Sequence, residues 1–163
     1  MSRVFIFAAG IAMSAPNHAE NIRRFFNDLS TENMHLLDDF YAEDVVFRDP
    51  AGDISGRSAL RGYYCHIYEP VTKIHFEFPH IQVQKDDVFA TWTMTFSSRK
   101  LKGGRSLTVD GISHLRFNTD GQVTYHRDYF DMGAMIYEHV PLVGCLIRYI
   151  KSRLNNHQPG EAP

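Results

Sequence analysis

Several patterns that would identify a function at once are absent from this sequence. It has two cysteines, Cys65 and Cys145, which are too few for a disulfide scaffold and lack the CxxC spacing of zinc or redox sites. A formal net charge of −2, with histidines neutral, gives no positive footprint for nucleic acid. There is no glycine-rich phosphate loop or nucleotide fingerprint. The histidines are scattered along the chain and form no HxH pair, so we predict neither a cofactor nor a metal.

Long hydrophobic runs are also scarce. The apolar run near the N-terminus, Val4–Met13, is too short to cross a membrane. With a single Arg3 before it and no clear Ala-x-Ala site after it, the run only weakly resembles a signal peptide. We therefore expect residues 1–15 to be a mobile or loosely docked segment of a cytoplasmic protein, with Met13 as an alternative start. The cysteines fit that compartment as buried reduced thiols, and one disulfide is the alternative.

The sequence does contain enough apolar residues for one folded domain. At 44% hydrophobic and 13% aromatic, a chain of 163 residues supports a single core. Asn17 and Glu20 stand at capping-box spacing and predict the start of a helix. The apolar face of that helix, at i, i+3, i+4 and i+7, comprises Ile22, Phe25, Phe26 and Leu29. A second predicted helix after Ser30-Thr31 carries Met34, Leu37 and Tyr41 on one face.

The chain is organised around the stretch from Phe40 to Tyr64. Within it, Val45, Phe47 and Asp49 share one face of a predicted short strand, and the two apolar residues turn that face inward. A turn sequence, Asp-Pro-Ala-Gly, starts at Asp49. A third helix is predicted from about Arg57 to Tyr68. Asp49 is therefore either a turn-forming residue or a base in a pocket.

Alternation of apolar and polar residues predicts strands in the second half of the chain. The clearest is Val88–Ser98, where apolar residues alternate with threonines. Others are predicted around Ile74–Phe78, where Pro79 marks a bulge or an edge, and at Leu107–Phe117 and Gln122–Asp131. Helices followed by hairpin-linked strands indicate an α+β domain with one strongly bent antiparallel sheet.

The central stretch resembles one known family, the steroid delta-isomerases and their SnoaL-like cyclase relatives, within the nuclear-transport-factor-2-like fold. The similar residues are Phe40-Tyr41-Ala42-Glu43-Asp44, Val46-Phe47-Arg48-Asp49-Pro50, Gly56-Arg57 and Gly62-Tyr63-Tyr64. The resemblance extends from about Ile22 to about Phe130. It implies a cone-shaped bent sheet, enclosed by the N-terminal helices, with a pocket for an apolar small molecule.

The last predicted strand supplies the remaining candidate site residues. Its two faces are both mixed, so periodicity alone leaves the inward face open. The resemblance places His126, Asp128 and Phe130 on the pocket wall. We predict Asp49 as the proton-transferring base, with His126 and Asp128 as a partner acid or as groups that orient water. The alternative is a surface ion cluster of His126, Arg127 and Asp128. The predicted substrate contacts are Phe25, Tyr41, Tyr64, Trp92, Met94, Phe96, Ser113 and Phe130.

Two positions depart from the steroid isomerase pattern. Phe25 stands where that family has an oxyanion tyrosine, and Ser113 where it has a protonated aspartic acid. Loss of a single oxyanion donor costs about 2.7–4 kcal/mol of transition-state stabilisation, so we do not expect an efficient ketosteroid isomerase. The Asp-Arg-Asp relay of epoxide hydrolases with this fold is not matched either. Its counterparts here, Arg127 and Asp128, are adjacent on a strand and face opposite ways.

The C-terminal region extends beyond the short members of that family. Pro141 divides residues 132–154 into two helical pieces. The second piece is amphipathic and basic, with an apolar stripe of Leu142, Val143, Leu146, Ile147, Ile150 and Leu154. Such a helix covers a core, closes a pocket, contacts a second copy or lies on a membrane. We expect it to cover the core and do not expect membrane contact.

These patterns predict one SnoaL-like domain over residues 16–154, with the C-terminal helices 132–154 included and a disordered tail at 155–163. We expect a homodimer through the sheet. The predicted function is a cofactor-independent enzyme of isomerase, cyclase or hydrolase type, transferring protons on an apolar substrate. The alternative is a non-catalytic ligand-binding or dimerisation module of the same fold.

Overall fold

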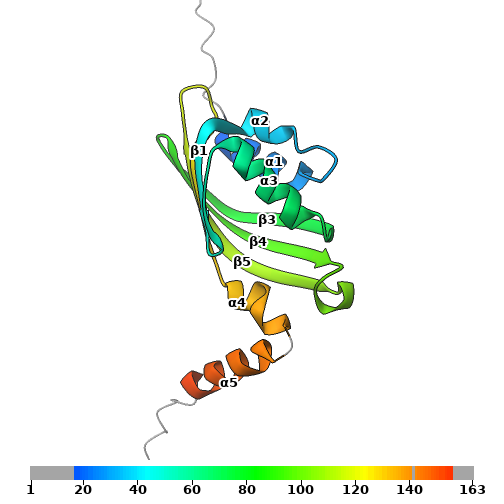
Figure 1. Ribbon diagram of the computed structural model, residues 1–163. Helices are drawn as coiled ribbons and strands as arrows, with labels where there is room; N and C mark the ends of the chain where they lie inside the picture. The colour runs from blue at the N-terminus through cyan, green and yellow to red at the C-terminus, as the bar shows by residue number, and fades with distance from the viewer. Residues whose placement is uncertain (1–16, 141, 156–163) are drawn as a thin grey trace, which may run out of the picture.

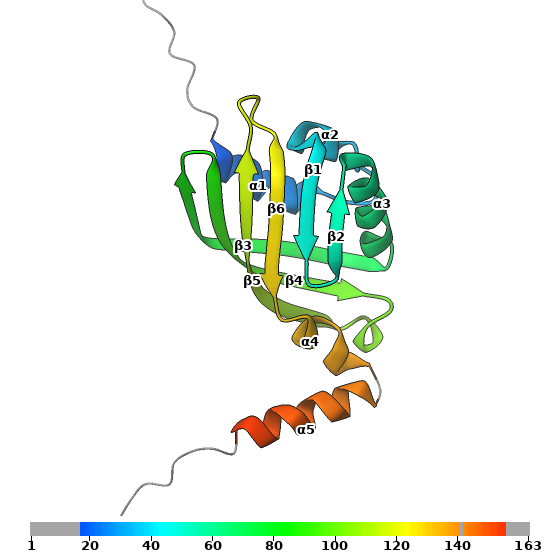
Figure 2. The ribbon, with the colours of Figure 1, turned by 60° about the vertical axis from the view of Figure 1, so that its left-hand side comes forward.

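The computed structural model describes residues 17–140 and 142–155. It has three N-terminal helices, a six-stranded sheet and two further helices at the C-terminus (Figures 1 and 2). The helices are α1 (His18–Asp28), α2 (Leu36–Phe40), α3 (Arg57–Tyr68), α4 (Met132–Met135) and α5 (Val143–Asn155), with the 3-10 turns η1 (Lys102–Gly104) and η2 (Tyr137–His139). The strands are β1 (Tyr41–Asp49), β2 (Gly52–Ser55), β3 (Val71–Gln84), β4 (Asp87–Ser98), β5 (Ser106–Phe117) and β6 (Val123–Phe130).

Helix α1 begins and packs as its sequence predicts. The Asn17 side chain accepts the Glu20 backbone N–H at 3.2 Å, and Ile22, Phe25 and Phe26 are buried. Asn27 fixes the helix on β3, because its amide exchanges two hydrogen bonds with the Phe76 backbone, at 2.9 and 3.0 Å. The capping and periodicity of this segment therefore determined the helix and its inward face.

The second helix is shorter than predicted. Met34, Leu37 and Tyr41 are all buried, but only residues 36–40 are helical and Tyr41 is the first residue of β1. Tyr41 has an extended backbone, with φ −106° and ψ 140°, and pairs with Val123 of β6. Strand pairing across a long sequence separation thus overrides the helical spacing of these residues.

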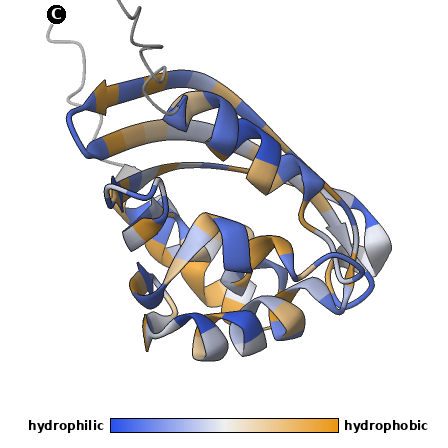
Figure 3. Ribbon diagram, turned by 90° about the horizontal axis from the view of Figure 1, so that it is seen from above, coloured by the Kyte–Doolittle hydropathy of each residue, from blue (hydrophilic) through white to orange (hydrophobic). Residues whose placement is uncertain are grey.

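The sheet is bent, and its strand order is β2-β1-β6-β5-β4-β3. Neighbours among the described strands pair antiparallel as predicted, except β1 and β6, which pair in parallel. The predicted irregularity at Pro79 is confirmed, because the β3–β4 register shifts between Glu77 and His80. Strand β2, a short return after the Asp49 turn, was not predicted. In the view from above, the sheet curves around the helices (Figure 3).

The core fills the space between helices α1–α3 and the concave side of the sheet. The larger cluster of buried apolar side chains joins the helices to β1 and to the near ends of the other strands. A second cluster, of Trp92, Met94, Phe96, Leu107 and Val109, covers the far part of β4 and β5. The two clusters are bridged by half-buried aromatic residues of β3, and a cavity opens at this point.

The C-terminal helix does not cover this core, which corrects our expectation. Helix α5 packs on η2 and projects away from the sheet (Figures 1 and 2). Leu142, Leu146 and Leu154, from the predicted apolar stripe, are 85%, 59% and 74% exposed. The reason is that the charged side of α5 holds the contacts with the domain. Among the described residues, no helix has both the length and the apolar character needed to cross a membrane.

The cysteines also differ from the prediction. Cys65 and Cys145 are free and exposed rather than buried. Cys65 lies on the outer side of α3, whose inner side is occupied by Leu60, Tyr64 and Tyr68. The predicted N-terminal segment 1–15 lies outside the described residues. Of the predicted tail 155–163, only Asn155 is described, as the end of α5.

Candidate functional site

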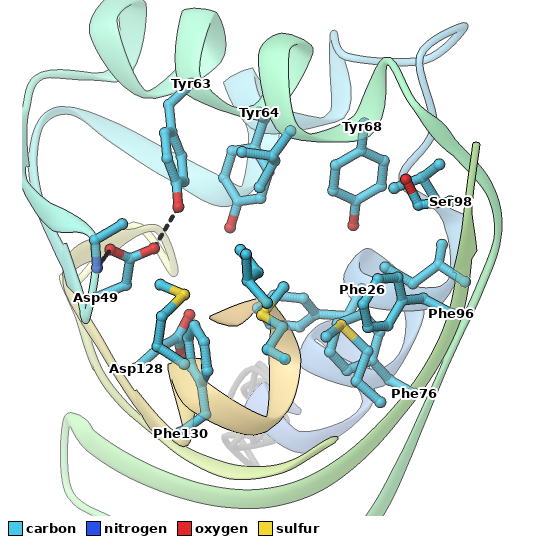
Figure 4. A pocket seen from close by; sticks show the side chains of 18 of the residues that line it. Phe26, Asp49, Tyr63, Tyr64, Tyr68, Phe76, Phe96, Ser98, Asp128 and Phe130 are labelled. Atoms are coloured by element: carbon cyan, nitrogen blue, oxygen red, sulfur yellow. Dashed lines mark hydrogen bonds between the residues drawn. The ribbon is translucent and has the colours of Figure 1, made fainter. Parts of the chain in front are cut away.

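A cavity of about 380 Å³ lies between α3, the concave face of the sheet and α4 (Figure 4). Most of its wall is aromatic or aliphatic. The lining residues from the sheet include Phe47, Ile74, Phe76, Phe78, Trp92, Met94, Phe96 and Phe130, and those from the helices include Phe26, Tyr63, Tyr64, Ile67, Tyr68, Met132 and Met135. Two carboxylates, Asp49 and Asp128, stand in this apolar wall. A pocket of this kind is the usual form of a small-molecule site.

Asp49 combines the two roles that its sequence left open. It ends β1, and its Oδ1 accepts the backbone N–H groups of Ala51 (2.7 Å) and Gly52 (3.0 Å), which fixes the turn into β2. Its other oxygen, Oδ2, accepts a hydrogen bond from the Tyr63 hydroxyl in the cavity. Three of the roughly four acceptor positions of the carboxylate are therefore occupied by protein groups.

Asp128 is held differently. It lies on β6 opposite Ser113 of β5, and its side chain is only 15% exposed. Oδ1 accepts hydrogen bonds from the Ser113 hydroxyl (2.5 Å) and from Nε2 of His126 (2.8 Å). Oδ2 has no hydrogen-bond partner among the described residues, and Asp128 lines the cavity. One oxygen is thus fixed by the protein while the other is available to a ligand.

His126 lies behind the wall and not in it. The imidazole is fully buried, and the rings of Phe26 and Phe47, which line the cavity, pack edge-on against it at 5.8 and 5.0 Å. Its Nδ1 lies 2.7 Å from the Tyr41 hydroxyl, which in turn lies 3.1 Å from the Tyr64 hydroxyl. A neutral imidazole with its proton on Nε2 fits these contacts, because Nε2–H then donates to Asp128 and Nδ1 accepts from the Tyr41 hydroxyl. The buried chain Tyr64–Tyr41–His126 therefore ends on Asp128.

The indole of Trp92 fixes Ser113. Its Nε1–H donates to the Ser113 hydroxyl oxygen at 2.9 Å, which leaves the serine proton for Asp128. The ring reaches across β5 because the paired residue is Gly111. A Cβ there would lie 2.3 Å from the indole. Glycine at this position is thus needed for close packing of the aromatic ring.

Three tyrosines of α3 face the cavity. Burial raises the pKa of Tyr63, Tyr64 and Tyr68, and the nearby carboxylates raise it further. All three hydroxyls consequently stay protonated and can donate hydrogen bonds over the ordinary pH range. Tyr63 donates to Asp49 and Tyr64 bonds to Tyr41, whereas the Tyr68 hydroxyl has no partner among the described residues.

Most of the predicted site residues meet at this cavity. Eight of them line it: Asp49, Tyr64, Trp92, Met94, Phe96, Ser113, Asp128 and Phe130. The remaining three, Phe25, Tyr41 and His126, do not, and we correct their placement. Phe25 stacks on Phe40 at 3.9 Å in the core, because its side of α1 meets α2. Tyr41 and His126 are fully buried and reach the cavity only through hydrogen bonds.

The alternative of a surface ion cluster on β6 is wrong. Arg127 points to the other side of the sheet, where its guanidinium lies 4.7 Å from the ring centre of Tyr129. His126 and Asp128 point to the concave side. The adjacent positions on the strand thus separate the arginine from the acid, as expected from the alternation of side chains.

Sequence reasoning missed Tyr63, Tyr68 and Ser98 as cavity residues. Tyr68 is four residues after Tyr64 and so lies on the same helix face, a spacing that could have revealed it. Ser98 ends β4, two residues after Phe96 and on the same side of the strand. No comparable sequence pattern predicted that the cavity wall includes Met132, Met135 and Ile136. Their position depends on how α4 folds back at the end of β6.

Comparison with known proteins finds one family model and many solved structures. The family model for the SnoaL-like domain matches residues 22–126. No curated protein sequence matches. An NTF2-like protein of unknown function from Burkholderia pseudomallei K96243 has 17% identity and a TM-score of 0.64, over 75% of this chain and 96% of that one.

Two further structures show the same fold. A protein described as a SnoaL-like polyketide cyclase, from Shewanella denitrificans OS-217, has 18% identity and a TM-score of 0.64, over 74% of this chain and 95% of that one. A protein with a ketosteroid isomerase-like fold from Catenulispora acidiphila DSM 44928, in complex with trimethylamine, has 14% identity and a TM-score of 0.64, over 77% and 93%. At these identities the comparisons establish the fold and leave the reaction open.

Proposed function

Since the chain belongs to the SnoaL-like domain family, we propose that it is a cofactor-independent enzyme that transfers a proton on an apolar small molecule. The reaction is of the isomerase, cyclase or hydrolase type. One observation carries the proposal: Asp128 stands in an apolar cavity with one carboxylate oxygen fixed by Ser113 and His126, while the other has no partner in the part of the chain that the structure describes. A positioned base in an apolar pocket suits proton abstraction.

Asp128 is the better candidate for the base than Asp49, which our sequence reasoning favoured. Both lie in the cavity, but protein donors already occupy both oxygens of Asp49. In the proposed step, Oδ2 of Asp128 takes the proton of an acidic C–H or of a water molecule. His126 and Ser113 are positioning residues, because their hydrogen bonds hold Oδ1. Tyr63 donates its only hydroxyl proton to Asp49, so its oxygen can accept, but not donate, a hydrogen bond at the ligand.

Efficient steroid isomerisation is not expected from this arrangement. Phe25, at the family's oxyanion tyrosine position, is packed in the core, and the Ser113 hydroxyl is committed to Asp128. The apolar wall favours an apolar substrate, and the resemblance to a protein described as a polyketide cyclase is consistent with a cyclic or ring-forming one. A cytoplasmic location and a homodimer through the sheet remain our predictions.

The test uses a simple carbon acid. In 5-nitrobenzisoxazole, removal of the C3 proton by a carboxylate breaks the N–O bond and releases a coloured phenolate, with no other reactant. We expect the protein to accelerate this ring opening and Asp128→Asn to lower the rate at least about a hundredfold. Asp49→Asn should lower it less. The control Asp110→Asn, at an exposed position on β5, should keep the rate.

Wild-type turnover in the Asp128→Asn variant would contradict the assignment of the base. The alternative function, a non-catalytic ligand-binding module, is favoured by the turn-forming role of Asp49 and by the aromatic wall. It predicts that the protein binds apolar molecules without accelerating the reaction at all. The absence of any acceleration would therefore favour that alternative.

A further inference from the structure

The cavity has polar groups at two ends, and the site proposed above uses only one of them. Asp49 and Asp128 lie at one side of the cavity, and Tyr68 and Ser98 lie at the other (Figure 4). Between them the wall is made of the aromatic and aliphatic side chains of β3, β4 and β6.

The Tyr68 hydroxyl is an unused hydrogen-bonding group. The residue is 6% exposed and its ring packs edge-on against Tyr64, so the side chain is fixed in place. The hydroxyl has no partner among the described residues and points into the cavity (Figure 4). Because the hydroxyl is open to the cavity, a ligand or water there can supply its hydrogen bond.

Ser98 provides a second hydroxyl at the same end. It is 3% exposed, and its oxygen accepts the backbone N–H of Lys100 at 3.2 Å. That bond leaves the hydroxyl proton without an acceptor among the described residues. Both groups are neutral, since burial raises the pKa of Tyr68 and keeps its phenol protonated. A neutral oxygen atom, which accepts two hydrogen bonds, matches two neutral donors.

We propose that Tyr68 and Ser98 form a distal subsite that binds an uncharged oxygen of the substrate, a hydroxyl or a carbonyl, at the end of an apolar body remote from Asp128. This inference rests on the proposed function and specifies its substrate class: an elongated apolar molecule with an oxygen at each end. The subsite fixes which carbon lies beside Asp128, because it sets how far the molecule slides along the cavity.

The experiment uses two aliphatic alcohols, 1-decanol and 1,10-decanediol, and the fluorescence of Trp92. Trp92 is the single tryptophan of the chain and lines the cavity, so its emission reports occupancy. The monoalcohol can place its one hydroxyl at the carboxylate end, whereas the diol must place its second hydroxyl at the distal end. The ratio of the two dissociation constants, diol over monoalcohol, therefore isolates the distal subsite.

We expect Tyr68→Phe to raise this ratio roughly three- to tenfold, which is the worth of one net hydrogen bond. Ser98→Ala should raise it by a similar or smaller factor. Tyr137→Phe, which alters a half-exposed tyrosine outside the cavity wall, should leave the ratio unchanged. If both alcohols bind and neither cavity variant changes the ratio, the subsite is overturned while the proposed function stands. If neither alcohol binds the wild-type protein, the apolar site and the subsite both fail.

A second, independent observation concerns helix α5, which is attached by its charged side. Gly144 lies against the Glu138 backbone, where a Cβ would come within 2.3 Å of the carbonyl oxygen. Arg148 donates to that same carbonyl at 2.9 Å. Lys151 bonds to the carboxylates of Glu138 (2.6 Å) and Asp131 (3.1 Å). These contacts fix the rotation of the helix about its axis.

The apolar side of α5 consequently faces outward. Its exposed large side chains are Leu142, Val143, Leu146, Tyr149, Ile150 and Leu154. Residues 142–155 include three basic side chains and no acidic one. The segment before α5 supplies Met132, Met135 and Ile136 to the cavity wall, and α5 follows α4 at that end of the molecule (Figure 1).

We infer that this face of α5 lies on an anionic phospholipid surface. Arg148 and Lys151 are bound to the domain, which leaves Arg153 as the cation beside the outward face. An outward apolar face with an aromatic residue, a cation and no acid is typical of helices that lie in the membrane interface. Arg153, whose guanidinium lies 5.5 Å from the ring centre of Tyr149, can reach the phosphates while the ring is inserted. Docking would bring the cavity to the surface in which apolar molecules dissolve.

The test is co-sedimentation of the full chain with vesicles of phosphatidylcholine alone or with phosphatidylglycerol added. We expect binding to the anionic vesicles, weakening at high salt, and at least about a tenfold loss for Leu146→Asp. Val83→Asp, a matched change at an exposed β3 residue, should bind as the wild type. Equal loss in both variants, or no binding to anionic vesicles, would overturn the inference. The inference would also be overturned if the protein forms a dimer that Leu146→Asp dissociates, while the variant binds vesicles as the wild type does.

Discussion

Helices α1 and α5 are both amphipathic, but they attach to the domain by opposite faces. Helix α1 buries Ile22, Phe25 and Phe26 and is capped by a polar side chain at its end. Helix α5 holds the domain with Arg148 and Lys151 and exposes its apolar face. The comparison shows that an amphipathic pattern predicts a helix and its apolar face, whereas the neighbouring segments decide which face meets the protein.

The interior of the domain shows the opposite of α5, because it buries polar groups whereas α5 exposes apolar ones. Tyr41, Tyr64 and His126 form a hydrogen-bonded chain in an aromatic core, and the chain ends on Asp128. Such a network stabilises the fold only when each member has a partner. The interior should therefore respond strongly to pH and to the loss of a single hydroxyl, and α5 should respond weakly.

The largest expected effect is alkaline destabilisation of the interior. The pKa of Tyr41, Tyr63, Tyr64 and Tyr68 is raised by burial, so the folded protein keeps protons that the unfolded chain loses above about pH 10. Stability is complete below that pH and falls as the pH rises through it, by about 1.4 kcal/mol per pH unit for each tyrosine.

Denaturant titrations between about pH 8 and pH 11, followed by Trp92 fluorescence, measure this decline in the free energy of unfolding. Because Tyr68→Phe removes one of these four phenols, of which Tyr63 is only half-buried, its slope should be about a quarter to a third smaller. A free energy of unfolding that stays constant up to pH 11 would contradict the burial of these hydroxyls.

A smaller effect is expected from Tyr41→Phe. The change removes the hydroxyl that bonds to Nδ1 of His126 and to Tyr64, and leaves a buried ring nitrogen without its partner. The free energy of unfolding should fall by about 1–3 kcal/mol. The matched change Tyr149→Phe, on the exposed side of α5, should stay within about 0.5 kcal/mol of the wild type. Equal losses of stability at the two positions would contradict the difference that we expect between the buried interior and helix α5.

The smallest effect is expected from truncation after Val140, which deletes α5. Because this helix packs on η2 and supplies no side chain to either core cluster, the melting temperature should change by no more than about 2 °C. This differs from our expectation from the sequence, in which the helix covers the core. Thermal scans and size-exclusion chromatography of the truncated protein measure the outcome. Loss of the cooperative transition would show that α5 stabilises the domain after all.

Local chemistry made much of the fold predictable. The Asn17 cap, the helix Arg57–Tyr68 and the irregularity at Pro79 depend on residues within one or two turns of each other, and each is present where predicted. The predicted extent of the second helix was wrong, because pairing of Tyr41 with Val123 on a distant strand competes with the helical pattern. The strands of the second half match because their side chains alternate between a buried and an exposed face.

The candidate site was predictable in its residues and less so in their roles. Asp49 and Asp128 were identified from a turn sequence and a strand, and both lie in the cavity. His126 was placed on the wall, but the rings of Phe26 and Phe47 cover it. Two-residue periodicity gives the face of a strand and contains no information on how far along the strand the cavity extends.

By itself, the sequence determined the α+β class, the strand alternation, the Asn17 cap of α1 and the presence of carboxylates near an apolar wall. These depend on short-range sterics and on the burial of apolar side chains. Only the tertiary structure decided that Asp128 keeps a free oxygen, that Tyr68 and Ser98 meet at the far end of the cavity, and that α5 turns its apolar side outward. The physical reason is that these three features depend on contacts between segments that are far apart in the sequence. Such contacts form only when the sheet folds around the helices.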